Sequence, residues 1–240
     1  KEVLNESDIA ELAVGIIEDY VGKLVMADFA ARNLERLMTF LEVAGETGRM
    51  LLVQPKDIYL LEACSLADPI QYQPALASDS LGMLTDPKST PRGWEKDVCG
   101  RWQERTVSHS DVSLNPGRYI LAISLWDLND LPDLEGINGG AYLFSNSKAY
   151  DEEQKADLDR MRAWIRWIGM DIYGDPKDEE GLKLHSSGHA GYHQLVDFVK
   201  TVNPEILIPV HTENPAWWID ALAGTGIEIH PPEVGVPIEL

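Results

Sequence analysis

The stretch "GKLVMADF", residues 22–29, is short, apolar and typical of a β-strand. Residues 31–48 follow it with apolar residues at helical spacing and end at Gly48. A second apolar strand, "RMLLVQP", is predicted over residues 49–55, and a second helix over residues 56–67. Strands that alternate with helices in this way predict an α/β fold, in which crossover helices cover a parallel sheet.

The pattern continues on both sides of this segment. A helix is predicted over residues 6–20, and strands over residues 118–128 and 140–147. Residues 151–170 form a long amphipathic helix, and residues 68–117 are irregular enough to suggest a loop with a helical excursion. The apolar side of the long helix comprises Met161, Trp164, Ile165 and Ile168.

A charged segment, "DPKDEEG" at residues 175–181, suggests a linker. We therefore expect two domains, residues 1–178 and residues 179–240. The second would contain a strand and loop up to Gly191, helices over residues 192–203 and 215–226, a strand over residues 205–211 and short strands at the end.

The chain is strongly acidic, with a formal net charge of −20 and a pI near 4.5. A surface with this charge repels phosphate backbones, which disfavours nonspecific nucleic-acid binding over the whole molecule. A local groove lined by basic side chains or backbone amides remains compatible with the composition.

Other global features point to a cytoplasmic protein. The two cysteines do not make a disulfide framework, no apolar run is long enough to cross a bilayer, and the first residues do not resemble a signal peptide. We expect no membrane partner. The chain begins at Lys1 rather than methionine, and we expect it to be part of a longer protein.

The loop "LHSSGHAG", residues 184–191, follows a predicted strand and precedes a predicted helix. Backbone amides at a helix N-terminus favour anions, and two serines with two glycines allow a phosphate to approach closely. His189 could donate a proton to a leaving oxygen. The alternative is an ordinary strand-to-helix turn made of turn-forming residues.

His211 ends the apolar stretch "EILIPVH". Ligands of open α/β sheets gather at the carboxyl ends of strands, so His189 and His211 would lie on the same rim if their strands were parallel neighbours. A neutral imidazole there can bind a metal, and Glu213 could orient it. The alternative is a histidine that hydrogen-bonds to the backbone. His193, four residues after His189, is expected to be a solvated helix residue.

These two stretches, together with the helix and proline between them, resemble the C-terminal segment of the β-CASP metallo-β-lactamase nucleases, which include RNase J and the nuclease subunits of mRNA 3′-end processing. The family pattern has a Ser-Gly-His loop, a helix, a proline and a strand that ends in Pro-Val-His-Gly-Glu. Only Thr212 departs from it, in place of glycine. Most of residues 1–60 and 118–240 is similar to the β-CASP domain and the segment that follows it, whereas residues 68–117 match no part of the pattern.

The resemblance implies a parallel-sheet, Rossmann-like β-CASP domain followed by the C-terminal part of a metallo-β-lactamase fold. It implies phosphodiester hydrolysis of RNA, single-stranded by expectation, with zinc as the cofactor. His189 would lie beside the scissile phosphate as a proton donor or a phosphate ligand, and His211 would bind zinc. The residues implied to contact RNA phosphates are Ser186, Ser187, Gly188, Arg32 and Asn33.

One departure is large, because the family's His-x-His-x-Asp-His zinc motif is absent from these 240 residues. A two-metal centre needs several carboxylate and imidazole ligands, so we expect this chain to be inactive alone and to be the C-terminal part of a nuclease. Two alternatives stay open. One is a non-catalytic RNA- or anion-binding scaffold with the same fold, and the other is an unrelated Rossmann-like protein that binds a small anion.

The resemblance also has a consequence for assembly. In the family, an N-terminal half covers an apolar face near the C-terminus. If that half is absent, the face is exposed, and large exposed apolar patches tend to associate. We therefore expect either a homodimer or a complex with that half. The face comprises Leu207, Ile208, Val210, Trp217, Trp218 and Leu222.

Overall fold

The computed structural model describes residues 4–84, 90–147, 151–177, 183–186, 190–210 and 212–238. The chain divides into two compact units, a larger one over Leu4–Ser186 and a smaller one from Ser187 onward. The boundary predicted between residues 178 and 179 falls outside the described residues and stays a prediction.

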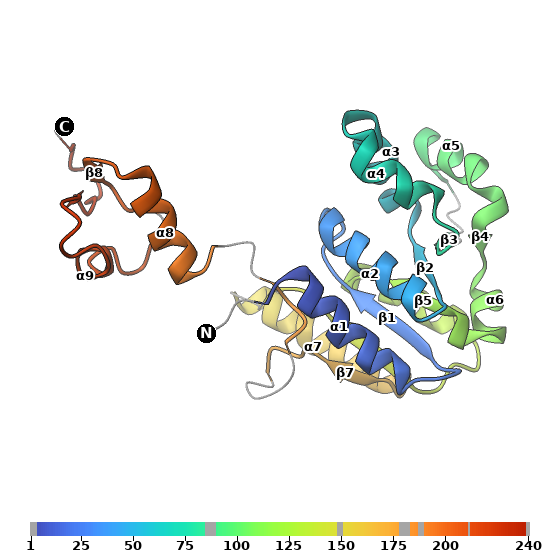
Figure 1. The fold of residues 1–240 in the computed structure, drawn as a ribbon. Coiled ribbons are helices and arrows are strands. Elements are labelled where there is room, and N and C mark those ends of the chain that lie inside the picture. The colour runs from blue at the N-terminus through green and yellow to red at the C-terminus, as the bar shows by residue number, and fades with distance from the viewer. Residues whose placement is uncertain are drawn as a thin grey trace. The chain divides into compact units, whose positions relative to one another are not determined.

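A seven-stranded sheet forms the centre of the larger unit, and all its paired strands are parallel (Figure 1). This confirms the α/β fold with a parallel sheet. In spatial order the strands are β4 (Thr106–Val107), β3 (Leu81–Leu84), β2 (Met50–Val53), β5 (Tyr119–Ala122), β1 (Leu24–Asp28), β6 (Gly140–Phe144) and β7 (Asp171–Tyr173).

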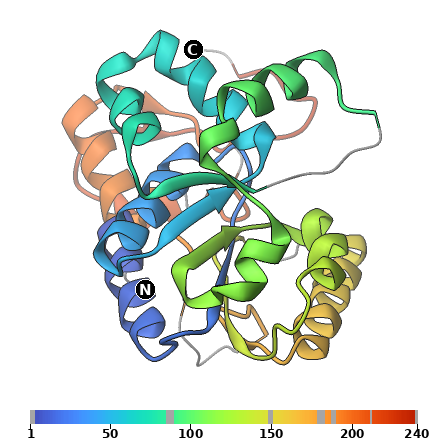
Figure 2. The same cartoon turned by 90° about the vertical axis from the view of Figure 1, so that its right-hand side faces the viewer.

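Helices cover both faces of this sheet (Figure 2). One apolar core contains residues from α1 (Glu6–Glu18), α2 (Leu34–Glu46), α3 (Pro55–Ala67), α4 (Pro69–Ala77) and α5 (Gly93–Arg101). The other contains residues from α6 (His109–Leu114), the 3-10 helix η3 (Leu125–Asp133) and α7 (Glu152–Trp167). Two short 3-10 turns, η1 (Gln103–Arg105) and η2 (Pro116–Arg118), connect strands and helices.

Strand β1 shows why an unbroken apolar run is needed at the centre. All five of its residues are buried, with Val25 and Ala27 in one core and Leu24 and Met26 in the other. A strand of a parallel sheet with helices on both faces has no polar side, so it lacks the alternation of a half-exposed strand.

Gly140 allows the neighbouring strand β6 to begin against β1. Its φ is +140°, and a Cβ atom there would lie 2.2 Å from the backbone oxygen of Leu24. Only glycine tolerates both this backbone angle and the lack of space for a Cβ atom. Gly140 is therefore the residue that allows β6 and β1 to approach each other closely here.

The larger unit differs from the sequence-based expectation in several places. Residues 68–117, expected to be irregular, contain α4, β3, α5, β4 and α6. The strand predicted over residues 118–128 ends at Ala122, and η3 follows it. The helix predicted to reach residue 170 ends at Trp167, and the next segment is the edge strand β7.

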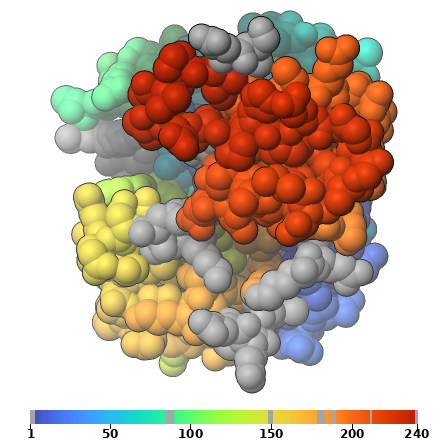
Figure 3. All heavy atoms as spheres, turned by 90° about the vertical axis from the view of Figure 1, so that its left-hand side faces the viewer, coloured from blue at the N-terminus to red at the C-terminus, as the bar shows by residue number. Residues whose placement is uncertain are grey.

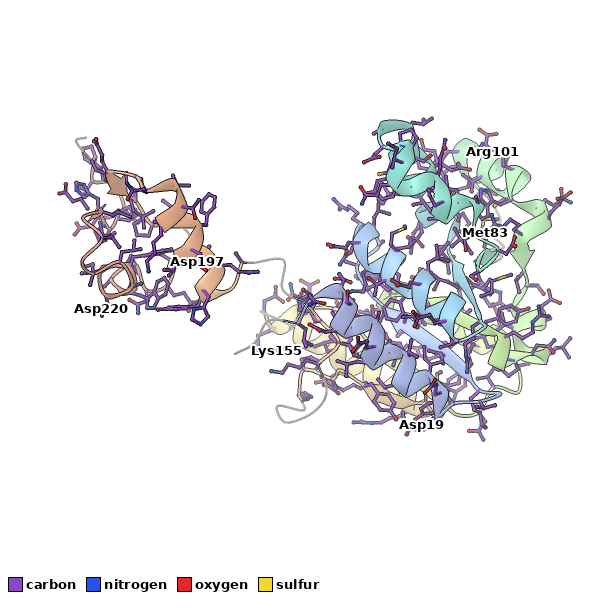
Figure 4. All side chains as sticks on the ribbon, in the orientation of Figure 1. Asp19, Met83, Arg101, Lys155, Asp197 and Asp220 are labelled. Carbon is purple, nitrogen blue, oxygen red and sulfur yellow. The ribbon has the colours of Figure 1, made fainter. Side chains whose placement is uncertain are left out.

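The smaller unit contains α8 (Tyr192–Val202), β8 (Ile206–Leu207), α9 (Trp217–Ala221) and β9 (Glu228–Ile229), with β8 and β9 paired in parallel. Figure 4 labels Asp197 on α8 and Asp220 on α9, and both carboxylates are exposed. The strand expected over residues 205–211 is short. Pro209 lacks the N–H that a ladder requires.

This unit has a small apolar core of its own, which contains Val196, Val199, Trp218 and Leu222. Figure 3 shows one face of the unit in orange and red. We expected Trp218 and Leu222 to be exposed, and this is wrong because they pack against α8. Of the predicted apolar face, Val210 is the residue that is largely exposed. The dimer stays a prediction.

Among the described helices, none has the length and apolar character needed to cross a membrane.

Candidate functional site at the carboxyl ends of the strands

The helices that follow β1 and β6 lie on opposite faces of the sheet. Helix α2, after β1, belongs to one core, and α7, after β6, belongs to the other. Ligands of open α/β sheets bind in the crevice at such a switch point. A cleft of about 530 Å³ lies there. Its polar lining residues are Asp28, Arg32, Lys56, Ser124, Asn146, Ser147, Gln154 and Asp157.

Asp28, the last residue of β1, is the most perturbed acid of this cleft. Its carboxylate accepts hydrogen bonds from the Tyr142 hydroxyl at 2.6 Å and the Asn146 amide at 2.7 Å. Burial raises the pKa of Asp28 to about 7, and the charge of Asp127 adds to this, although the two hydrogen bonds oppose it. Near neutral pH this carboxyl is therefore divided between its neutral and charged forms.

Arg32 and Lys56 supply the positive charge of the cleft. Arg32 is exposed in the turn between β1 and α2. The Lys56 ammonium donates to the Asp127 carboxylate at 2.8 Å. Arg32 thus presents its charge to the cleft mouth, where an anion can reach it.

Asn33, which the resemblance places near RNA, has a local structural role. Its side-chain oxygen accepts a hydrogen bond from the Arg36 backbone N–H at 3.0 Å and so caps helix α2. The cap fixes the start of helix α2 directly after Arg32. The predicted contacts of Arg32 and Asn33 with RNA stay predictions.

Arg36 is a fully buried arginine that connects four segments of the larger unit. Its guanidinium forms a bidentate pair with Glu6 of α1, with both hydrogen bonds at 2.8 Å. It also donates to the backbone oxygens of Ser145 and Leu184, each at 3.0 Å, and to the Ser145 hydroxyl. Sequence analysis did not single out Arg36, although a charged residue between Leu34 and Leu37 on an amphipathic helix is a recognisable signal.

The contact between Arg36 and Leu184 places the start of the 184–191 loop beside the end of β6. His185, the next residue, has a buried Nδ1 with no hydrogen-bond partner within the described part of the chain. Burial and the positive charge of Arg36 lower the pKa of His185. Its imidazole is therefore neutral at neutral pH.

The structure places only part of the predicted site. Ser186 is half-buried at the end of the larger unit, and Glu213 is exposed in the smaller unit. The remaining members, Ser187, Gly188, His189 and His211, lie outside the described residues. Their predicted roles therefore stay predictions.

The described residues do not by themselves fit a zinc centre. Within the described ranges, no three His, Cys, Asp or Glu side chains lie close enough together to hold a metal ion. A structural or catalytic zinc site requires at least three protein ligands.

The C-terminal part of the chain matches a known family. Residues 183–229 match the model RMMBL, described as the Zn-dependent metallo-hydrolase RNA specificity domain. This match supports a relationship to the metallo-β-lactamase family. A comparison with curated proteins gives no match.

The fold resembles a solved structure. This is the crystal structure of a protein of unknown function from Enterococcus faecalis V583, with a TM-score of 0.65 and 16% sequence identity. The match covers 98% of this chain and 46% of that chain, so the present chain spans about half of that protein's length. At this identity the likeness shows the fold alone.

Proposed function

We propose that this chain forms the RNA-contacting part of a zinc-dependent phosphodiester hydrolase of the β-CASP type. The observation that carries the proposal is the match of residues 183–229 to an RNA specificity domain of Zn-dependent metallo-hydrolases. The Arg36 contacts support it, since they hold the first residues of this segment at the carboxyl edge of the sheet, where α/β proteins bind ligands.

In this proposal the 186–189 loop binds a backbone phosphate of single-stranded RNA. Ser186, Ser187 and Gly188 would surround the phosphate, and His189 would give a proton to the leaving oxygen. His211 would supply one zinc ligand, with Glu213 hydrogen-bonded behind it. The other ligands would come from residues beyond these 240, so the chain alone would bind RNA without cleaving it.

A second candidate is a non-catalytic RNA- or anion-binding scaffold. The observation that favours it is the cleft of the larger unit, where Arg32 can pair with an anion without any metal ligand. Both candidates bind RNA, and they differ in whether His211 binds zinc.

Binding and cleavage of a labelled single-stranded RNA by the full chain, with and without Zn²⁺, test the proposal. We expect binding without cleavage, and we expect His189→Ala to weaken binding. His193→Ala is the matched control, because His193 is an exposed residue of α8 outside the loop and should bind like the unmodified chain. Equal affinities of the two variants would contradict a role for the 186–189 loop.

Zinc binding separates the two candidates. If His211 is a zinc ligand, a protein that joins this chain to the remaining ligands should bind Zn²⁺ in calorimetry. His211→Ala should lower that zinc affinity, whereas the RNA affinity should stay near that of the unmodified protein. Unchanged zinc binding in His211→Ala would favour the scaffold.

A further inference from the structure

The cleft at the switch point carries an aromatic side chain that the proposed phosphate contacts do not use. Trp126, in η3, lines the cleft and is 71% exposed. A tryptophan normally buries most of its large apolar surface, so one this exposed at the rim of a cleft points to a ligand.

The backbone around Trp126 is held in place by its neighbours. The Asp127 carboxylate accepts hydrogen bonds from the backbone N–H and hydroxyl of Ser124, at 2.9 Å and 2.7 Å. Lys56 of α3 binds the same carboxylate. The Arg160 guanidinium lies 5.9 Å from the centre of the indole ring, within the range of a cation–π contact. The backbone that carries the ring is therefore fixed, which lowers the entropy that a ligand must overcome.

The charge of the cleft differs from that of the whole chain. The chain has 40 acidic and 20 basic residues, whereas the charged lining residues are two of each sign, namely Arg32, Lys56, Asp28 and Asp157. Asp28 is partly neutral near pH 7 because burial raises its pKa to about 7. An anionic ligand thus meets less repulsion here than the net charge of −20 implies.

We propose that this cleft holds one nucleotide of single-stranded RNA, with its base stacked on Trp126 and its phosphate paired with Arg32. This inference rests on the proposed function and adds a base contact to it. Stacking on an aromatic platform combined with a basic contact to the backbone is how proteins bind single strands without reading their sequence. The cleft volume of about 530 Å³ is within the range of sites for small ligands.

The test compares two fluorescent RNA probes on the full chain, a decamer of adenosine and a decamer of the same ribose-phosphate backbone without bases. Trp126→Ala should weaken binding of the adenosine decamer by about 5- to 150-fold, the range found for loss of one base stack. It should leave binding of the abasic decamer unchanged. Trp126→Phe should restore most of the affinity, because a phenyl ring also stacks.

Two further variants complete the design. Trp167→Ala is the matched control, since Trp167 is 64% exposed on α7 and is not among the residues that line the cleft. Its affinity should equal that of the unmodified chain. Arg32→Ala should weaken both probes by the same factor, because both carry phosphates.

Equal binding of the adenosine decamer by Trp126→Ala and the unmodified chain would overturn the stacking inference and leave the proposed function standing. Failure of the unmodified chain to bind either decamer would overturn both. Thermal unfolding of each variant establishes that the folded state is retained.

Discussion

At the residue scale, Asp28 makes the stability of the larger unit depend on pH. Burial raises its pKa from an ordinary value of 3.8 to about 7, so the folded state holds this proton more tightly than the unfolded chain does. The stabilisation is complete below pH 3.8 and is lost as the pH rises through about 7. The slope is at most about 1.4 kcal/mol per pH unit for a single proton.

Asp28→Asn should therefore flatten the pH dependence of the unfolding free energy between pH 5 and pH 8. Asp57 has a pKa raised to about 6 by burial and contributes a similar slope to both proteins, so the difference between them isolates Asp28. Urea unfolding of both proteins at several pH values measures the pH dependence of the unfolding free energy. Identical slopes of unfolding free energy against pH would show that the Asp28 carboxyl is charged in the folded state across this whole pH range.

Some residues of the cleft could be expected from the sequence and others could not. The family resemblance implied that Arg32 contacts RNA phosphates, which stays a prediction, and the structure places Arg32 in the lining of the cleft. Asp28 and Trp126 were not predicted to belong to a site. Asp28 is important through its contacts with Tyr142 and Asn146, and Trp126 through its contact with Arg160, and these partners are far away in sequence. No local pattern reports such contacts.

At the element scale, Arg36 fixes the position of the segment that leads into the 184–191 loop. Its guanidinium contacts α1, the end of β6 and the Leu184 carbonyl at the same time. Removal of one partner from a buried pair leaves the other uncompensated, which typically costs about 3–5 kcal/mol. Lysine cannot replace it, because an ammonium lacks the planar fork that binds a carboxylate through two hydrogen bonds.

We expect Arg36→Met to lower the unfolding free energy by about 3 kcal/mol, the lower end of that range, because Glu6 keeps 23% of its side chain in solvent. Amide hydrogen exchange over residues 184–186 should accelerate more than exchange over β1. Arg160→Met is the matched control, since its pair with Asp157 is an exposed i,i+3 contact and should contribute little. If both variants were equally stable, Arg36 would not have the role assigned to it.

Some elements could be predicted from sequence and others could not. Strands β1, β2 and β6 are mostly apolar runs of four or five residues, and their existence follows from pattern alone. Strand β3 contains Gly82, and a Cβ atom there would lie 2.7 Å from the Met50 sulfur, so packing against β2 selects a residue that weakens the strand signal. Strand β7 has three residues, directly after a helix, and is too short for periodicity to detect.

At the scale of the whole molecule, the alternation of strands and helices predicted a parallel sheet, and the structure confirms it. The order of the strands could not be predicted from the sequence, because the insertion of β5 between β1 and β2 depends on pairing between residues almost 100 positions apart. The switch point, and hence the cleft, follows from that order. This is why the loop residues could be proposed from motifs whereas the cleft required the structure.

The measurement that tests the central claim most directly is the affinity of the full chain for single-stranded RNA as a function of salt concentration. If the chain binds RNA phosphates, the logarithm of the association constant should fall linearly with the logarithm of salt concentration. Arg32→Ala should make the slope shallower by about 0.7 for the one phosphate contact it removes. An absence of RNA binding at low salt, or binding that does not depend on salt, would contradict the account.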